Sequence, residues 1–329
     1  MKNSCLFIRL VVIFCTLVDY TISNSEPSFM SAYGLTVRSS SQLNNQLYEV
    51  VVASNEVRNN QKIRILLPLD YTTDNNNNRR YPVLYLLHGS FGGAEDWTIL
   101  GRAQSICGNA SLITVMPNGD PFGFYTNWIL PGNSTPQNWL TFHMEQLVPW
   151  IDFNLRTVAR KQGRAIAGLS MGGFGAIHYA EFYPDRFIYA VSFSGALDLL
   201  NTDIQNVILN LIMIDDSPSL IGPFGYPNAS SIDANGWFIY DPITHAKDLR
   251  STMVALYTGN TGTLESILRN SSYNLRDTLV SLNISIHFND YENGQSIENG
   301  CDGAHTWSCW NAALIDVFPR IMAILQQDL

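Results

Sequence analysis

A serine between two glycines stands at Gly168-Leu169-Ser170-Met171-Gly172, directly after the apolar run Ala165-Ile166-Ala167. This pattern is typical of a nucleophile elbow, in which a sharp strand-to-helix turn exposes the serine hydroxyl and the glycines let neighbouring backbone pass closely. The N-terminus of the following helix favours a developing oxyanion. We therefore predict that Ser170 is a catalytic nucleophile. The alternative for so short a pattern is an ordinary tight turn.

A serine nucleophile needs a base, and in this type of site the chain order is serine, acid, histidine. Three histidines follow the predicted elbow helix: His245, His287 and His305. His287 falls inside an apolar run, and no strand leads His245 to the sheet edge. His305 lies in a glycine-containing loop between the last apolar run and the last helical pattern, so we predict that it is the base.

The elements that must position these residues alternate along the chain. Short apolar or alternating runs predict strands at 48–53, 62–68, 83–87, 112–116, 164–167, 187–193, 253–257 and 284–288. Helical spacing or position predicts helices at 139–155, 172–183 and 310–326. This alternation predicts an α/β fold with a mostly parallel central sheet and helices on both faces. The stretch 198–243 breaks the rhythm and is expected to cover the C-terminal edge of the strands.

Composition excludes several classes of protein. The chain has 329 residues, of which 46% are hydrophobic and 14% charged, so it can bury a large core and is not disordered. Its formal net charge is −9, and Arg79-Arg80 is its most basic point, which argues against nucleic-acid and anionic-membrane partners. We expect one domain over residues 24–329; the oligomeric state stays open.

The N-terminus predicts export. An apolar run at 10–18 is too short to span a bilayer, and Thr21-Ile22-Ser23 offers a cleavage site, so residues 1–23 are predicted to be a signal peptide. The alternative is an uncleaved anchor. Five N-glycosylation sequons, at Asn109, Asn133, Asn228, Asn270 and Asn283, also suit a secreted glycoprotein.

Six blocks in the same order resemble the antigen 85 mycolyltransferases and the wider esterase D and feruloyl esterase family of α/β hydrolases. They are Leu87-His88-Gly89, Phe124–Trp128, Gly168–Gly172, Phe187–Ala190, Tyr257–Asn260 and His305–Trp307. The resemblance covers residues 41 to 329. It implies an α/β-hydrolase fold and a serine esterase or acyltransferase that works through an acyl-enzyme, without cofactor or metal.

The resemblance also implies the remaining site residues. Leu264-Glu265 and Arg269 match a Leu-Glu-x-x-x-Arg stretch that carries the acid in the antigen 85 branch, so Glu265 is the expected acid, with Asp277 and Asp290 as alternatives. A carboxylate at a helix start is also favoured for structural reasons alone. The oxyanion hole is expected from the backbone N–H groups of Met171 and of Ser90, the residue after His-Gly.

Substrate contacts are expected from aromatic residues near these motifs, Phe91, Trp97 and Trp307, and from Asp198, which matches a sugar-contacting position of the antigen 85 branch. Phe91 stands where the mycolyltransferases have arginine, so their trehalose-mycolate specificity is not carried over. The expected substrate is a small-molecule or glycan-linked carboxylic ester. The alternatives are acyl transfer to a sugar or other alcohol, and a non-catalytic secreted binding protein.

Cysteines bracket the predicted base. Cys301 and Cys309 lie on either side of His305, and in an oxidising compartment they could form a disulfide that restrains its loop. The alternative is that Cys309 packs as a small apolar residue while Cys301 is free or pairs with Cys107.

Overall fold

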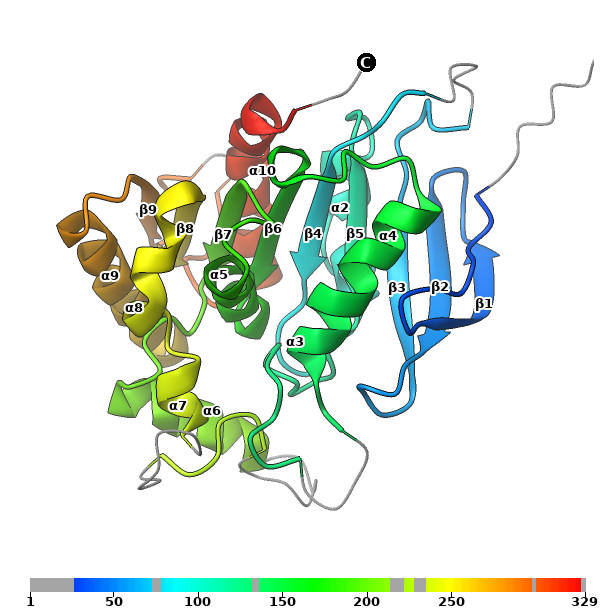
Figure 1. Cartoon of the computed structure of the whole chain (residues 1–329). Helices are drawn as coiled ribbons and strands as arrows, with labels where there is room; N and C mark the ends of the chain where they lie inside the picture. Colours follow the sequence, from blue (N-terminus) through cyan, green and yellow to red (C-terminus); the bar gives the residue numbers. More distant parts are fainter. Residues whose placement is uncertain are drawn as a thin grey trace, which may run out of the picture.

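One sheet organises the part of the chain that the computed structural model describes, residues 27–72, 78–131, 136–213, 222–227, 235–297 and 300–326 (Figure 1). The predicted signal peptide, residues 1–23, lies outside the described residues. Within the described ranges the sheet has nine strands in the order β1-β2-β3-β5-β4-β6-β7-β8-β9. They are β1 Thr36–Gln42, β2 Leu47–Ala53, β3 Asn60–Leu66, β4 Val83–Leu87, β5 Ile113–Pro117, β6 Arg164–Leu169, β7 Tyr189–Phe193, β8 Met253–Gly259 and β9 Ile286–Glu292.

The direction of the strands divides the sheet into two regions. β1, β2 and β3 pair antiparallel, and β3 is also antiparallel to β5. From β5 to β9 every neighbouring pair is parallel, as expected when helices connect successive strands. The C-terminal ends of β4, β6, β7 and β8 therefore meet at one edge.

Helices cover both faces of the sheet, as the continuously apolar strands require (Figure 1). They are α1 Asp96–Ile99, α2 Ala103–Cys107, α3 Trp139–Thr141, a π-helical segment Phe142–Leu147, α4 Val148–Asn154, α5 Met171–Phe182, α6 Thr202–Met213, α7 Gly236–Ile239, α8 Pro242–His245, α9 Thr263–Ser281 and α10 Trp307–Ile324. Short 3₁₀ segments occupy Lys161–Gly163 and Ala246–Ser251.

The hydrophobic core has two layers, and the alternation of side chains along β4 explains both. Val83, Tyr85 and Leu87 join the cluster that packs α3, α4, α5 and α9 on one face. Leu84 and Leu86 join the cluster that packs α2 and α10 on the other. Successive side chains of a strand point to opposite faces, so a run buried throughout must be covered twice.

The predicted fold class is confirmed, and every predicted strand is present with bounds shifted by a few residues. Several details differ. The helices α1 and α2 and the extent of α9 were not predicted. β1 was not predicted, because its Thr-Val-Arg-Ser-Ser-Ser-Gln sequence is polar and mostly exposed. The predicted helix 139–155 is interrupted by the π-helical segment, and the last helix begins at Trp307 rather than Trp310. In the stretch 198–243 the structure describes residues 198–213, 222–227 and 235–243, which contain α6, α7 and the start of α8.

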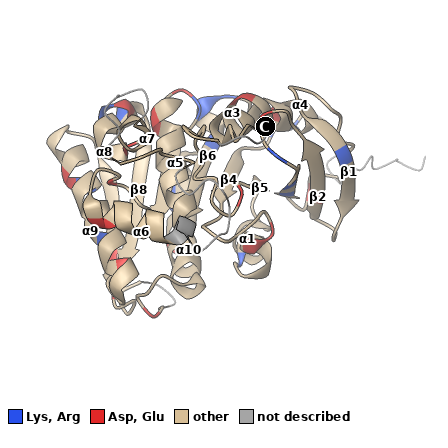
Figure 2. Ribbon diagram, turned by 90° about the horizontal axis from the view of Figure 1, so that it is seen from below, with Lys and Arg blue, Asp and Glu red and all other residues tan. Residues whose placement is uncertain are grey.

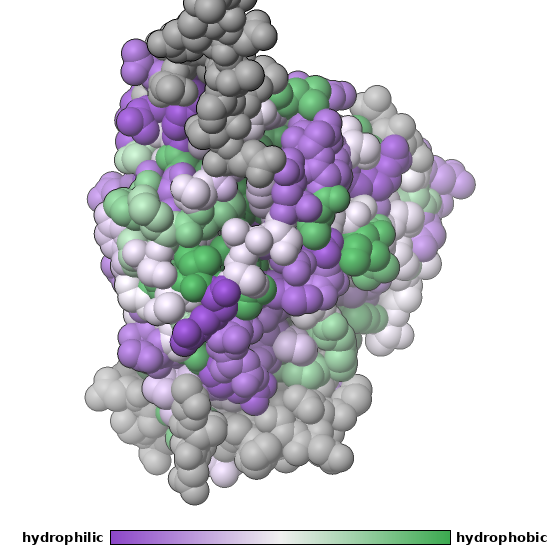
Figure 3. Space-filling model, turned by 90° about the vertical axis from the view of Figure 1, so that its right-hand side faces the viewer, coloured by the Kyte–Doolittle hydropathy of each residue, from purple (hydrophilic) through white to green (hydrophobic). Residues whose placement is uncertain are grey.

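The outer strand β1 forms a polar edge. Its register shifts between Val37 and Ser39, and polar side chains and irregular pairing are common ways of protecting an edge strand from pairing with another chain. On this side of the molecule, hydrophilic and hydrophobic residues of the described part are intermixed (Figure 3). Among the described residues, no helix combines the length and the apolar character needed to cross a membrane.

Candidate active site

Ser170 lies at the turn between β6 and α5, with φ of 53° and ψ of −121°. A positive φ is strained for a residue with a side chain, and such strain is characteristic of a nucleophile elbow. Gly172 shows why the flanking residue is small: a Cβ there would lie 2.5 Å from the carbonyl oxygens of Leu87 and His88. The elbow therefore packs directly against the end of β4.

His305 connects Ser170 to Glu265. Its Nε2 lies 2.9 Å from Ser170 Oγ, and its Nδ1 lies 2.8 Å from Glu265 Oε2. A carboxylate accepts hydrogen bonds, so the ring proton is on Nδ1 and Nε2 is free to accept from the serine hydroxyl. The structure thus brings together three residues predicted for the site, which are separated by 135 and 40 residues in the chain.

Glu265 is buried, with 1% of its surface exposed, and hydrogen bonds hold its carboxylate in place. Its Oε1 accepts from Ser194 Oγ at 2.7 Å, from the backbone N–H of Gly259 at 2.8 Å and from Thr258 Oγ1 at 3.2 Å. A buried carboxylate is tolerated when donors replace its lost water. The donors fix the direction in which Oε2 faces His305.

The residues considered as alternative acids and bases make contacts away from Ser170. Asp277 pairs with Arg276, and Asp290 accepts from Arg269 and Tyr273. His245 lies near the backbone oxygen of Ile239, and His287 lies 3.8 Å from Asp316. None of these four contacts Ser170 or His305 in the described part of the chain.

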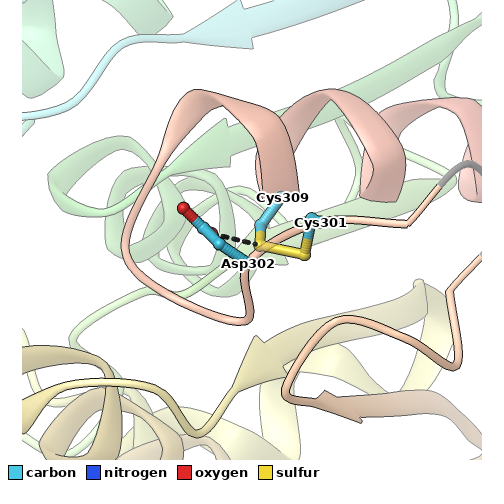
Figure 4. Close-up of side chains that lie close together, drawn as sticks. All are labelled: Cys301, Asp302 and Cys309. Carbon is cyan, nitrogen blue, oxygen red and sulfur yellow. Dashed lines mark hydrogen bonds between the residues drawn. A yellow bond between two sulfur atoms is a disulfide. The ribbon is translucent and has the colours of Figure 1, made fainter.

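The loop that carries His305 is closed by a disulfide between Cys301 and Cys309, whose Cα atoms are 5.0 Å apart (Figure 4). Within this loop Asp302 accepts hydrogen bonds from Thr306 Oγ1 and from the backbone N–H of Ala304. Cys301, Asp302 and Cys309 also lie close enough to suggest a metal site, but the two sulfurs are bonded to each other and offer no thiolate. Cys107 is a separate buried thiol.

Removing this disulfide is expected to lower both stability and turnover. Closing a loop of this size stabilises a protein by roughly 2–3 kcal/mol in the chain-entropy model, so the double variant Cys301→Ser/Cys309→Ser should melt about 5 °C lower. Looser restraint of His305 should reduce kcat more than it raises KM. Thermal unfolding and steady-state kinetics measure both effects.

The double variant also supplies the control. A reductant should lower the melting temperature of the native protein and leave that of the double variant unchanged. Equal melting temperatures for the native protein and the double variant would contradict a stabilising role for the disulfide.

Two backbone N–H groups are open beside Ser170. Neither Ser90 nor Met171 donates its N–H to an acceptor within the described residues. The Ser90 loop is close, since a Cβ on Gly89 would lie 3.3 Å from Ser170 Cβ. An oxyanion hole requires free backbone donors of this kind next to the serine.

His88 supports this loop rather than acting as a base. Its Nδ1 lies 2.8 Å from the carbonyl oxygen of Gly89, and its Nε2 accepts from the N–H of Gly119 at 2.8 Å. These partners require a neutral ring with the proton on Nδ1. Desolvation in the core lowers the pKa of His88, which agrees with the neutral form.

A cavity of about 350 Å³ opens at Ser170. Its lining combines small, apolar and aromatic residues with few polar ones: Gly89, Ser90, Phe91, Gly92, Asp96, Leu100, Leu169, Ser170, Leu264, His305, Trp307 and Trp310. A larger cavity of about 760 Å³, lined by Tyr189, Arg250 and His287 among others, lies at the N-terminal ends of β7, β8 and β9. The smaller cavity is the candidate active site, because its described lining includes the strained Ser170 and His305, and that of the larger cavity does not.

The structure brings two of the four predicted substrate contacts into the cavity. Phe91 and Trp307 line it. Trp97 does not: it is 1% exposed, its indole N–H donates to the carbonyl of Leu87, and its ring packs edge-on against Trp307 at 5.2 Å. Asp198 does not line it either, and accepts a hydrogen bond from Asn274 at 2.7 Å.

Sequence reasoning missed the residues that hold the acid, Ser194 and Thr258, and the cavity residues Asp96 and Trp310. Ser194 and Thr258 are polar residues at the C-terminal ends of apolar strands, β7 and β8. That position was the available signal, since functional side chains gather where parallel strands end. Trp310 packs edge-on against His305 at 4.9 Å and limits where the ring can move.

Comparison with known sequences agrees with this geometry. The family model described as "Putative esterase" matches residues 54–321. An esterase of Mycobacterium tuberculosis is 46% identical over 146 residues, which are 43% of this chain and 30% of that relative. This chain therefore spans less than a third of that protein. The diacylglycerol acyltransferase/mycolyltransferase Ag85B of Mycobacterium leprae is 31% identical over 260 residues, 74% of this chain and 76% of that protein.

Solved structures show the same fold. The crystal structure of Mycobacterium tuberculosis MPT51 superposes with a TM-score of 0.67 over 84% of this chain and 97% of that one, at 22% sequence identity. The parallel sheet, the elbow after β6 and the helices on both faces are those of an α/β hydrolase. With the family model covering most of its length, this chain belongs to the esterase family of α/β hydrolases.

Proposed function

We propose that this protein is a serine esterase that cleaves carboxylic esters through an acyl-enzyme on Ser170. The observation that carries the proposal is the unbroken chain of contacts from Ser170 Oγ through His305 to Glu265, at 2.9 and 2.8 Å, beside a cavity. These distances are those of a nucleophile and a general base in hydrogen-bond reach.

The first half of the reaction forms the acyl-enzyme. Ser170 Oγ attacks the ester carbonyl carbon while its proton passes to His305 Nε2. The negative charge that develops on the carbonyl oxygen accepts hydrogen bonds from the N–H groups of Ser90 and Met171. The bond between the carbonyl carbon and the alcohol oxygen then breaks, and His305 Nε2–H protonates the leaving alcohol.

The second half regenerates the serine. A water molecule gives a proton to His305 Nε2 and attacks the acyl carbon, and the acid leaves as Ser170 Oγ recovers its proton. Glu265 stays ionised throughout, keeps the ring proton on Nδ1 and stabilises the imidazolium. The donors from Ser194, Thr258 and Gly259 keep the Glu265 carboxylate aligned with the ring.

Acyl transfer is the second candidate, and the similarity to Ag85B of Mycobacterium leprae favours it. The chemistry differs in one step, because an alcohol hydroxyl in place of water attacks the acyl-enzyme. Aromatic residues on the cavity wall, among them Trp307, suit a sugar acceptor or a carbohydrate-linked ester. A non-catalytic binding protein is the third candidate; the aligned Ser170 and His305 argue against it.

Nitrophenyl esters of increasing chain length, with and without a sugar acceptor, separate the three candidates. We expect hydrolysis: one equivalent of free acid for each nitrophenol released, with no effect of the acceptor. An acceptor-dependent ester product would favour transfer. Release no faster than in buffer would overturn an enzymatic function and leave a binding protein.

We further propose that residues 24–329 form one exported domain. One sheet includes strands from β1 to β9, and α10 packs onto it. Sequon residues Asn109, Asn270 and Asn283 are exposed, as glycan attachment requires, whereas Asn133 and Asn228 lie outside the described residues. A disulfide near the catalytic histidine suits an oxidising compartment.

A further inference from the structure

One carboxylate faces the cavity beside Ser170. Asp96, the first residue of α1, lines the cavity, and the only other titratable residue in the lining is His305. The neighbours of Asp96 on the wall are apolar or aromatic, among them Leu100, Leu264 and Trp307. The acidic start of α1 is visible as a red stretch beside its label in Figure 2.

The carboxylate is held by the backbone and leaves one oxygen free. Asp96 Oδ2 accepts from the N–H of Gly93 at 3.2 Å. It lies directly over Gly92, because a Cβ there would be 2.1 Å from the same oxygen. Asp96 Oδ1 has no hydrogen-bond donor within the described residues and remains available to a ligand.

No basic side chain forms an ion pair with Asp96 within the described part of the chain, although the charge of Arg64 lowers its pKa. Arg64 pairs instead with Glu49 and contacts Thr98 of α1, and Lys62 lies 3.7 Å from the adjacent Glu95. Partial burial raises the pKa of Asp96 and outweighs the opposing attraction of Arg64. A half-buried carboxylate without an ion-pair partner can therefore act electrostatically on a ligand in the cavity.

We infer that Asp96 determines substrate specificity, by favouring esters that present a hydroxyl or ammonium donor to the cavity and disfavouring esters that carry a carboxylate. The inference rests on the proposed esterase function. Its physical basis is twofold: the free Oδ1 is a hydrogen-bond acceptor, and a second negative charge in the cavity would be repelled by the Asp96 carboxylate. The effect is one of binding and selection, since Asp96 takes no part in the proton transfers.

The test compares matched neutral and anionic esters. One pair places the carboxylate in the acyl group, 4-nitrophenyl hexanoate against the 4-nitrophenyl monoester of adipic acid. The other pair places it in the alcohol, phenyl butyrate against 4-carboxyphenyl butyrate. For each pair the ratio of kcat/KM, neutral over anionic, is measured in the native protein and in Asp96→Asn.

The native protein is expected to favour the neutral ester in at least one pair, and Asp96→Asn should reduce that ratio about tenfold, mainly through faster cleavage of the anionic ester. Glu95→Gln is the matched control: it removes the adjacent carboxylate, which is not part of the cavity lining, and should leave both ratios unchanged. Asp96→Ser provides a second variant in case Asp96→Asn fails to fold.

Unchanged ratios in a folded, active Asp96 variant would overturn the specificity role and leave the esterase proposal intact. If Glu95→Gln shifted the ratios as much as Asp96→Asn does, net charge and not the position of Asp96 would set them. This result would also overturn the specificity role. A native protein that cleaves neither member of either pair would instead remove the esterase function on which the inference rests.

Discussion

Replacing Ser170 by alanine is expected to lower kcat for ester cleavage by about 10³- to 10⁶-fold, and His305→Ala by a similar factor. The two side chains act in one step, since the hydroxyl attacks only as the imidazole takes its proton. The double variant should therefore be hardly slower than either single variant. Steady-state kinetics on a nitrophenyl ester, with circular dichroism to verify folding, measures all three.

Two other histidines provide matched controls for this experiment. His245 and His287 also follow the elbow helix in the chain, but their partners are Ile239 and Asp316 rather than the serine. His245→Gln and His287→Gln should keep most of the activity. An active Ser170→Ala variant, or losses that multiply in the double variant, would contradict the proposed mechanism.

Glu265→Gln is expected to lower kcat by about 10²- to 10⁴-fold while the protein stays folded. The physical reason is the ring proton. A glutamine amide can donate to His305 Nδ1, which would place the ring proton on Nε2 and leave that atom unable to accept from Ser170. The imidazolium would also lose the negative charge that stabilises it. The measurement is kcat at saturating substrate, together with the melting temperature.

The competing carboxylates test this assignment directly. Asp277 and Asp290 form ion pairs with Arg276 and Arg269 of α9, and neither contacts His305 within the described residues. Asp277→Asn and Asp290→Asn should retain near-native kcat. Asp290→Asn should lose some stability, because the Asp290 carboxylate also accepts a hydrogen bond from Tyr273. A large loss of kcat in either one, with an active Glu265→Gln, would show that the acid is misassigned.

The fold was largely predictable because its central strands carry a strong local signal. β4 and β5 are buried at every position, so their sequences are apolar except for Thr114, and the ends of the apolar runs indicate the ends of the strands. β1 carries no such signal, since its pairing with β2 depends on backbone hydrogen bonds and not on apolar side chains. The π-helical break at Phe142–Leu147 was equally invisible, because it preserves an apolar spacing close to that of an α-helix.

The candidate site was predictable where chemistry depends on local sequence. The turn around Ser170 needs its glycines, and His305 follows from chain order, whereas Glu265 required a family resemblance. Ser194 could not be predicted as its partner, since 71 residues separate the two in the chain. Trp97 was wrongly predicted to contact substrate. Closeness in sequence to a motif does not fix the direction of a side chain, and the Trp97 ring is buried in the core.

The central claim is that an ester transfers its acyl group to Ser170, and acid quenching during turnover tests it most directly. The protein is mixed with excess nitrophenyl ester, quenched within the first turnover, digested and mapped by mass spectrometry. We expect the acyl mass on the peptide containing Ser170, in an amount equal to the initial burst of nitrophenol, and no adduct in Ser170→Ala. An adduct on another residue would contradict the account. So would equal rates of hydrolysis in the native protein and in His305→Ala, with neither a burst nor an adduct in either protein.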